Sequence, residues 1–396
     1  MLVGCLLLVF FVLRYSSASV ADREKSCDTA TDVDHIFEDG NLRERYLVCV
    51  DTLALLFNIS ACRCKLGVDL VYTWVNGSDP GHKHALGNIL TQVGLSRDNL
   101  EKRFRDFGEA STLKYSLRSQ QKYAQWLRHV WVVTADKKTQ VPSFLDLHVD
   151  TISVVDHATI FPDWAKDALP TFDSCAIEMN LHRIPGLSEC YLYLNDDVLF
   201  NKQLEFNMLW PESETVPYAW TNYIIAPYSS RGQDAWGTKL SNVAKSIRRE
   251  TRMKRKDILL VGHHGHFFVK PVVKYLLEEV FAPEMRETAL SRYRGPNSFW
   301  IPFVYSNYMF WKFHATRKRV HAFYHPIHEE EAVVALEETF EKLSTIPFKS
   351  KYAWVCFNDL LDKSVPPGLV ETLKHGLETI FPHPSTYEFI NSSIHD

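Results

Sequence analysis

The segment VDLVYTWVNGSDP, residues 68–80, decides the fold. Its first eight residues are mostly β-branched or aromatic, and turn-forming residues follow at positions 76–80. This pattern is typical of a buried strand that ends in a loop. Ligands bind open α/β sheets beyond the carboxyl ends of the strands. The loop is therefore a candidate contact for a nucleotide.

Three later segments have the same apolar, β-branched and aromatic character, at residues 129–134, 151–156 and 191–194. A helix-like stretch at residues 113–127 precedes the first of them. Strands that alternate with helices predict an α/β fold with a mostly parallel sheet flanked by helices. The pattern does not determine the order of the strands.

The composition is that of an ordinary globular protein. Of 396 residues, 46% are hydrophobic and 23% are charged, which allows one large domain or two smaller ones. The net charge of −4 argues against a nucleic-acid-binding protein, because such proteins are usually clearly basic. Ten tryptophans offer surfaces for stacking sugars or bases, although core packing is the more frequent role of any single one.

An apolar run at residues 2–13 precedes Arg14 and several small residues. It is shorter than the about 20 residues that span a bilayer and has the length of the apolar part of a signal peptide. A short signal-anchor and a buried core helix are the alternatives. We expect residues 1–20 to be a signal peptide or signal-anchor, residues 21–65 a cysteine-containing extension, and residues 66–396 the main domain. Membrane contact is expected only through such an anchor.

The cysteines favour the secretory pathway as well. Four of the eight lie at positions 27, 49, 62 and 64. Cys62 and Cys64 lack the two-residue spacing of common zinc sites, so disulfides are expected rather than metal. Two glycosylation sequons, at residues 58–60 and 391–393, support the same compartment weakly.

Two adjacent carboxylates, Asp196 and Asp197, follow an apolar strand in YLYLNDDVLF, residues 191–200. Adjacent carboxylates repel each other unless a cation or hydrogen bonds compensate them. Mg²⁺ prefers a few carboxylates together with phosphate oxygens and water. The pair could therefore hold Mg²⁺ against a nucleotide diphosphate and stabilise the leaving group. Turns and helix caps also use aspartates often, so the pair alone leaves both roles open.

Three histidines, His263, His264 and His266, precede an apolar stretch at residues 267–281 that is predicted to be helical. Histidine titrates near neutral pH and suits acid–base work. A hydrogen bond at the start of a helix is an equally frequent role for any one of them. The cluster alone is a weak metal-site signal, because no partner cluster accompanies it.

Arg292 and Arg294 flank Tyr293 in SRYRGP. Guanidinium groups bind phosphate bidentately, so the two could clamp a transferring phosphoryl group; a surface salt bridge is the alternative. A basic run at residues 245–256 is either a solvated helix or an approach surface for an anion. The sequence contains no Walker loop, no GxSxG elbow and no HExxH motif.

Four blocks of sequence, which together span residues 68–389, carry a family resemblance. They are DLVYTWVNGSD at 69–79; RFRDFGE at 103–109 with LKYSLRS at 113–119 and the segment from LPTFD to NDDVLF at 169–200; residues 264–314; and WVCFND at 354–359 with IFPHPSTYEF at 380–389. On these blocks the chain resembles the Stealth family. That family includes bacterial capsular polysaccharide phosphotransferases and the α/β subunit of eukaryotic N-acetylglucosamine-1-phosphotransferase.

The family transfers a hexose-1-phosphate from a nucleotide sugar to a sugar hydroxyl and releases a nucleoside monophosphate. The resemblance therefore implies a sugar-phosphate transferase with a Rossmann-like, GT-A-like sheet and Mg²⁺ or Mn²⁺. It further implies a donor similar to UDP-N-acetylglucosamine, a glycan or glycoprotein acceptor, and a location in the Golgi lumen. A homodimer is left open.

The resemblance also implies the residues of the site. The catalytic set is Asp196, Asp197, His264 and Arg294, and the two aspartates are the metal ligands. The nucleotide-sugar contacts are Trp74, Asn76, Gly77, Asp79, Arg105, Arg118 and Asn195. Additional candidates are His263, His266, Arg292, Asn358 and Asp359.

The chain departs from the family pattern at two places. Residues 110–112 are inserted in the second block, which alters a loop, and Phe357 and Leu360 flank the Asn-Asp pair of the fourth block atypically. Two rival functions remain: a metal-dependent glycosyltransferase that attacks the anomeric carbon and releases UDP, and a non-catalytic carbohydrate-binding protein. Which aspartate binds metal, and whether His264 or an aspartate is the base, stays open.

Overall fold

The computed structural model describes residues 56–57, 59, 64–65, 67–95, 111–226, 235–328, 332–361 and 365–389. The expected leader at residues 1–20, most of the expected extension at 21–65, and Arg105 lie outside the described residues.

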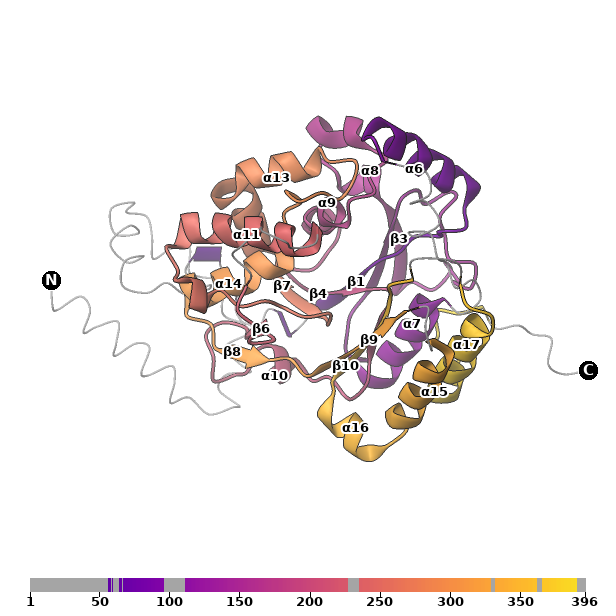
Figure 1. Cartoon of the computed structure of the whole chain (residues 1–396). Helices are drawn as coiled ribbons and strands as arrows, with labels where there is room; N and C mark the ends of the chain where they lie inside the picture. Colours follow the sequence, from indigo (N-terminus) through magenta and orange to yellow (C-terminus); the bar gives the residue numbers. More distant parts are fainter. Residues whose placement is uncertain are drawn as a thin grey trace, which may run out of the picture.

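A five-stranded sheet forms the centre of the fold (Figure 1). Its spatial order is β3 (Ile152–Asp156), β2 (Val130–Thr134), β1 (Val68–Thr73), β4 (Cys190–Asn195) and β7 (His266–Val269). The first four strands are parallel, and β7 pairs antiparallel with β4. All four strands predicted from the sequence lie in this sheet, so the prediction of an α/β fold with a mostly parallel sheet is confirmed.

The chain changes direction across the sheet between β1 and β4. It moves outward from β1 to β2 and β3 and then returns to the other side of β1. Thr73, at the end of β1, is the register partner of Asn195, at the end of β4. The loops that follow these strands therefore leave the sheet side by side, at the kind of switch point where open α/β sheets bind ligands.

Helices surround the sheet (Figure 1). The group beside β4 and β7 comprises α11 (Ala235–Thr251), α12 (Lys270–Tyr275), the π-helical η7 (Leu276–Val280), α13 (Ala282–Ala289) and α14 (Ile301–Phe313). The other elements around the sheet are the 13-residue helix α6 (Pro80–Gln92), the short α8 (His157–Ile160), η4 (Asp163–Ala168), α9 (Ser174–Glu178), η5 (Leu181–Arg183), α10 (Phe206–Leu209) and η6 (Arg255–Asp257), and a two-stranded sheet of β6 (Ala219–Thr221) and β8 (Arg317–Arg319).

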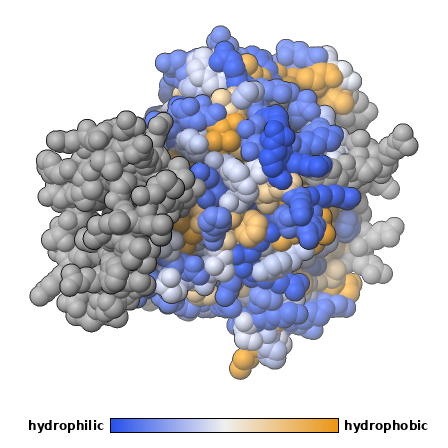
Figure 2. All heavy atoms as spheres, turned by 90° about the vertical axis from the view of Figure 1, so that its left-hand side faces the viewer, coloured by the Kyte–Doolittle hydropathy of each residue, from blue (hydrophilic) through white to orange (hydrophobic). Residues whose placement is uncertain are grey.

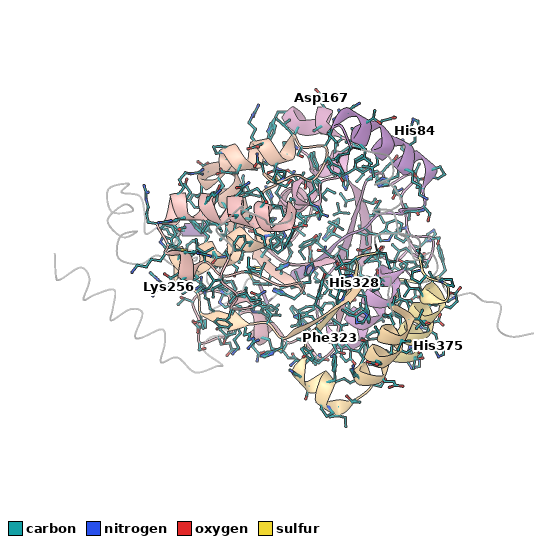
Figure 3. All side chains as sticks on the ribbon, viewed as in Figure 1. His84, Asp167, Lys256, Phe323, His328 and His375 are labelled. Carbon is teal, nitrogen blue, oxygen red and sulfur yellow. A yellow bond between two sulfur atoms is a disulfide. The ribbon has the colours of Figure 1, made fainter. Side chains whose placement is uncertain are left out.

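A second sheet lies next to the first and has the order β5 (Val198–Phe200), β10 (Trp354–Asp359) and β9 (Ala322–Ile327). Figure 3 labels Phe323 and His328 near the two ends of β9. Its own apolar cluster packs it against α7 (Thr112–Tyr123), α15 (Ala332–Leu343) and α17 (Leu369–Ile380), with α16 (Ile346–Lys351) at the edge. The acidic pair occupies the turn between β4 and β5, where the chain passes from one sheet to the other.

The predicted helix at residues 267–281 is only partly correct. Its first residues form β7, because Phe267 and Phe268 pair with β4 in the sheet. The helix begins at Lys270, and Pro271 occupies its first turn, where proline costs no hydrogen bond. The other predicted helix, at 113–127, ends earlier than expected, at Tyr123.

The basic run at residues 245–256 covers the last turns of α11 and part of η6. Lys254, Arg255 and Lys256 are exposed, and Figure 3 shows Lys256 on the outer side of the molecule. The face seen from that side is largely hydrophilic (Figure 2). The run is therefore a solvated surface rather than part of the cavity at the switch point.

A disulfide joins Cys64 to Cys190 at the start of β4. The prediction of a disulfide in place of metal is confirmed for this pair of cysteines. Within the described ranges, Cys175 and Cys356 are free and buried. No helix in these ranges is long and apolar enough to cross a membrane.

Candidate functional site

A cavity of about 440 Å³ opens at the switch point. Its walls come from the loop after β1, the starts of α7 and α9, the turn after β4, and the end of β10. It brings together predicted site residues from all four sequence blocks: Trp74, Gly77, Asn195, Asp196, Asp197, Arg294, Asn358 and Asp359.

The loop after β1 divides its predicted contacts between two roles. Trp74 and Gly77 line the cavity. Asn76 shapes the loop, because its side-chain oxygen accepts from the amide of Ser78 at 2.9 Å. Asp79 caps α6 by accepting from the amide of His82 at 2.6 Å. Asn76 and Asp79 thus position the loop instead of lining the cavity.

Asp197 is fixed by the neighbouring strand β10. Its Oδ2 accepts from Asn358 Nδ2 at 3.2 Å and from the Cys356 thiol at 3.5 Å, and its carbonyl accepts from the amide of Phe357 at 3.0 Å. Its Oδ1 is buried and has no hydrogen-bond partner. Burial raises the pKa of this carboxyl group, while nearby His263 and the bond from Asn358 oppose the rise.

These residues fit a divalent cation whose coordination is completed by oxygens of a bound substrate. Asp196 and Asp197 both line the cavity, and the unpartnered Oδ1 of Asp197 is a buried acceptor that a cation would satisfy. Mg²⁺ characteristically uses one or two carboxylates plus phosphate oxygens and waters. Within the described ranges, no three or more His, Cys, Asp or Glu side chains form a cluster that could hold a metal ion.

His264 is a buried, neutral base. Its Nδ1 donates to the carbonyl of Gly265 at 2.7 Å, and since a carbonyl only accepts, the proton of the neutral ring is on Nδ1. Burial lowers its pKa to about 4, so the ring is uncharged near neutral pH. Its Nε2 is buried without a partner and keeps a free lone pair.

The two neighbouring histidines have different surroundings. The ring of His266 lies 4.4 Å from that of His264, and burial lowers its pKa well below the ordinary value. His263 lies 4.8 Å from the ring of Tyr324. Burial lowers its pKa, and the carboxylate of Asp197 opposes this shift. His263 is therefore the histidine that interacts electrostatically with the acidic pair.

A second, inner cavity of about 110 Å³ adjoins the first. The two share four lining residues: Ser174, Asn195, Arg294 and Asn358. Arg294 is exposed at this junction and donates to Ser174 Oγ at 3.4 Å. Its loop is anchored because Ser298 Oγ donates to the buried Asp173 carboxylate at 2.5 Å. The arginine is thus placed to meet a charged group that bridges the two cavities.

Two predicted arginines lie elsewhere. Arg118 forms a buried bidentate ion pair with Glu388, at 2.8 and 2.7 Å, and donates to the carbonyl of Phe381. Three of its five N–H donors are engaged by these structural partners, and Arg118 is not among the residues that line either cavity. Arg292 donates to the carbonyl of Asp167 at 2.5 Å, on the outside of the molecule (Figure 3).

Several lining residues were not predicted from the sequence. His82 and His157 line the outer cavity, and Glu178 and Lys239 line the inner one. Glu178 falls inside the second block of the resemblance, which was a usable signal. Lys239 is a single lysine in an amphipathic helix, and no local pattern distinguishes it from a solvated one.

Family models match three segments of the chain. Residues 67–85 match Stealth conserved region 1, residues 103–217 match conserved region 2, and residues 262–310 match conserved region 3. The chain belongs to the Stealth proteins. These Stealth regions coincide with the first three blocks of the predicted resemblance, and the fourth block stays a prediction.

Relatives of this Stealth chain include three bacterial proteins. The exopolysaccharide phosphotransferase cps2G of Lactiplantibacillus plantarum is 42% identical over 35% of this chain and 37% of its own length. The capsular polysaccharide phosphotransferase WcwK of Streptococcus pneumoniae is 25% identical over 81% of this chain and 99% of its own. The exopolysaccharide phosphotransferase CpsY of Mycobacterium tuberculosis is 29% identical over 87% of this chain and 62% of its own length. The chain thus matches little more than a third of cps2G, and 14% of the Streptomyces coelicolor relative SCO2592.

The structural comparison is weaker. The galactosyltransferase LgtC matches 79% of this chain and 96% of its own, at 10% identity and a TM-score of 0.38. A likeness at this score supports no inference about the chain.

The predicted location in the secretory pathway and the Golgi lumen is wrong. It rested on the apolar run at residues 2–13, on the cysteines and the two sequons, and on the eukaryotic member of the family. The relatives found are bacterial exopolysaccharide and capsular polysaccharide phosphotransferases, not Golgi proteins.

Proposed function

We propose that this chain is an enzyme that transfers a hexose-1-phosphate from a nucleotide sugar to a hydroxyl of an acceptor glycan and releases a nucleoside monophosphate. The observation that carries the proposal is the convergence of Asp196, Asp197 and Arg294 on one cavity at the switch point of the sheet. The names of the bacterial relatives, all phosphotransferases that act on exopolysaccharide or capsular polysaccharide, support it.

The larger cavity suits a nucleoside diphosphate. Trp74 and Gly77 lie at the carboxyl end of β1, where an α/β sheet receives a nucleotide. The diphosphate then lies over the acidic pair, with Asp196 and Asp197 holding Mg²⁺. When bound, the ion neutralises the diphosphate and stabilises the departing nucleotide.

The transfer itself needs one bond made and one broken. The oxygen of the acceptor hydroxyl forms a bond to the phosphorus that carries the sugar, and the bond from that phosphorus to the nucleoside monophosphate breaks. Arg294 stabilises the charge on the phosphoryl oxygens, as guanidinium groups do in phosphoryl transfer. The free lone pair of His264 Nε2, or else His263 or an aspartate, takes the proton of the hydroxyl.

The donor in this proposal is UDP-N-acetylglucosamine, with Mg²⁺ or Mn²⁺ as the cation. It follows from the resemblance to the N-acetylglucosamine-1-phosphotransferase subunit, and a panel of UDP-hexoses tests it directly. A glycan is the proposed acceptor.

Product analysis decides the reaction. The full chain is incubated with Mg²⁺, a UDP-hexose and a glycan acceptor, and the nucleotide products are identified by mass spectrometry. UMP together with a phosphodiester-linked product supports the proposal, and Asp197→Asn should lower its formation by about 10²–10³-fold, since it removes a ligand charge. Asp163→Asn, on the exposed η4, is the control. UDP as the product indicates a glycosyltransferase, and donor binding without any turnover indicates a non-catalytic carbohydrate-binding protein.

A further inference from the structure

The inner cavity is lined by two ionisable side chains that the proposed transfer does not use, Glu178 and Lys239, and by His264, a candidate base of that transfer. Glu178 is 5% exposed, Lys239 is 2% exposed and His264 is 2% exposed. All three line the same cavity of about 110 Å³, and each has an unused donor or acceptor. Buried polar groups are normally paired, so the cavity calls for a ligand that can pair with Glu178 and Lys239.

Lys239 is an under-coordinated buried cation. Its ammonium donates to the Cys175 sulfur at 3.4 Å and lies 3.7 Å from the centre of the Trp236 ring. Within the described ranges no carboxylate lies within ion-pair distance of it. Burial lowers its pKa. A thiol is a weak acceptor, so hydrogen-bond donors of the ammonium remain available to the cavity.

Glu178 has one engaged oxygen and one unengaged oxygen. Its Oε2 accepts from Trp300 Nε1 at 3.1 Å, and no described residue donates to Oε1. Burial raises the pKa of this carboxyl group to about 7, while the charges of Lys239 and Arg294 oppose the rise. The group is therefore kept near its midpoint at neutral pH and offers the cavity an acceptor.

The chemistry of this lining selects among ligands. Lys239 and Arg294 would attract a phosphate, but a phosphate only accepts hydrogen bonds and would leave Glu178 Oε1 without a donor. A hydroxyl both donates and accepts, so neighbouring hydroxyls can donate to Glu178 Oε1 and accept from Lys239. His264 Nε2 then stays available to the acceptor hydroxyl. Trp236 and Trp300, whose ring centres lie 5.1 Å apart, add aromatic surface, which suits the C–H face of a pyranose ring.

The position of the cavity agrees with this chemistry. It meets the larger cavity at Arg294, next to the acidic pair. A nucleotide sugar whose diphosphate lies at that junction directs its hexose into the inner cavity and its nucleoside toward β1.

We propose that the inner cavity is the subsite for the hexose of the donor, and that Glu178 and Lys239 determine which hexose is accepted through hydrogen bonds to its ring hydroxyls. This inference rests on the proposed use of a nucleotide sugar, but it does not depend on which bond of that donor is broken.

Binding measurements on the full chain test the subsite without any turnover. The dissociation constants of UDP and of a UDP-hexose are measured by titration calorimetry with Mg²⁺ present. Wild-type chain should bind the UDP-hexose more tightly than UDP. Glu178→Gln keeps an acceptor for Trp300 Nε1 but removes the charge, and Lys239→Met keeps the length of the side chain. Each variant should raise the dissociation constant of the UDP-hexose at least tenfold and that of UDP less than twofold.

A panel of UDP-hexoses that each lack one ring hydroxyl sharpens the assignment. One member should bind wild-type chain at least tenfold more weakly than the parent, and this difference should disappear in Glu178→Gln. Glu278→Gln is the matched control, since Glu278 is an ion-paired glutamate outside both cavities.

The outcomes separate the two proposals. An equal loss of affinity for UDP and for the UDP-hexose, or no change in either affinity, overturns the hexose subsite, even if UMP is the product of the reaction. A loss of affinity for the UDP-hexose alone supports the subsite, even if the product is UDP and the phosphotransferase proposal fails. UDP affinity and the thermal unfolding midpoint show whether each variant is folded. If Glu178→Gln does not fold, the dissociation constants of UDP and UDP-hexose for Lys239→Met decide whether the hexose subsite is correct.

Discussion

Asn358 Nδ2 donates a hydrogen bond of 3.2 Å to Oδ2 of Asp197, across a sequence separation of 161 residues. The amide of Asn358 is itself oriented, because its Oδ1 accepts from the hydroxyl of Tyr324 at 3.0 Å. Strands β9 and β10 therefore set the orientation of one member of the acidic pair. A ligand carboxylate that is held in this way presents its other oxygen, the unpartnered Oδ1, in a fixed direction.

Removing the amide of Asn358 should weaken the proposed metal site. Asn358→Leu leaves Asp197 Oδ2 without its amide donor, and groups that orient metal ligands typically contribute 10–100-fold to metal affinity or activity. We expect a comparable loss of transfer and a higher Mg²⁺ concentration at half-maximal rate, measured by Mg²⁺ titration of UMP release. Tyr324→Phe removes only the outer hydrogen bond and should have a smaller effect in the same direction. An unchanged Mg²⁺ dependence in Asn358→Leu would show that this bond does not position the ligand.

The sequence predicted what local patterns encode. The four strands were recognised because runs of β-branched and aromatic residues form buried strands wherever they pair. The order of the strands was not recognised, because the pairing of Thr73 with Asn195 is a contact between distant segments. Residues 267–269 were assigned to a helix, since a short apolar run does not distinguish a strand from a helix.

For the candidate site too, the residues marked by local sequence were predicted and those that depend on distant contacts were not. The acidic pair and Arg294 were singled out from local motifs, received their expected roles from the resemblance, and line one cavity. Arg118 was taken for a nucleotide contact, because its partner Glu388 lies 270 residues away and no local pattern indicates an ion pair over that distance. Lys239 was missed for the complementary reason: its burial depends on packing against Trp236 and Cys175.

The ion pair of Arg118 with Glu388 should be structural. Arg118→Met removes the bidentate partner of the buried Glu388 carboxylate and leaves Lys114 Nζ, 3.9 Å from its Oε2, as the remaining cation. Removal of one partner of a buried ion pair typically costs about 3–5 kcal/mol of unfolding free energy, which is the upper limit here. Denaturant unfolding should show this loss, while UDP affinity of the folded protein stays unchanged. The double variant with Glu388→Leu should recover most of the stability, since it removes the unpaired charge. If Arg118→Met lowers the affinity for UDP and leaves the stability unchanged, the original assignment of Arg118 as a nucleotide contact is correct.

Gly265 should tolerate no side chain. A Cβ at this position would lie 2.6 Å from Trp354 Cη2, a buried ring with little room to move. Overpacking of this kind costs about 1–3 kcal/mol, so Gly265→Ala should lower the thermal unfolding midpoint. It should also lower the transfer rate, because the Gly265 carbonyl holds His264 in place. Gly262→Ala is the matched control for stability, since its Cβ would make only an ordinary contact of 3.5 Å with the His264 ring. Equal stability of the two variants would contradict this account of Trp354 packing.

Glu178 should make the protein less stable as the pH rises from about 4.5 to about 7. Its pKa in the folded chain is raised to about 7 from an ordinary 4.5, chiefly by burial. The folded state therefore binds more protons than the unfolded state in this window, and unfolding free energy falls as pH increases. A shift of this size corresponds to roughly 3 kcal/mol at most across the window.

Glu178→Gln carries no titrating group at this position, so it should lose this part of the pH dependence. The measurement is denaturant unfolding of both proteins at pH 4.5 and pH 8. The variant should gain stability relative to wild type at pH 8 and gain little at pH 4.5, where the wild-type carboxyl group is already protonated in the fold. Lys239 acts with the opposite sign: burial lowers its pKa, so between its folded and unfolded pKa values the unfolded state binds more protons and the unfolding free energy rises with pH. A constant difference between the two proteins at both pH values would mean that the Glu178 carboxylate is fully compensated in the fold, and its raised pKa would then be excluded.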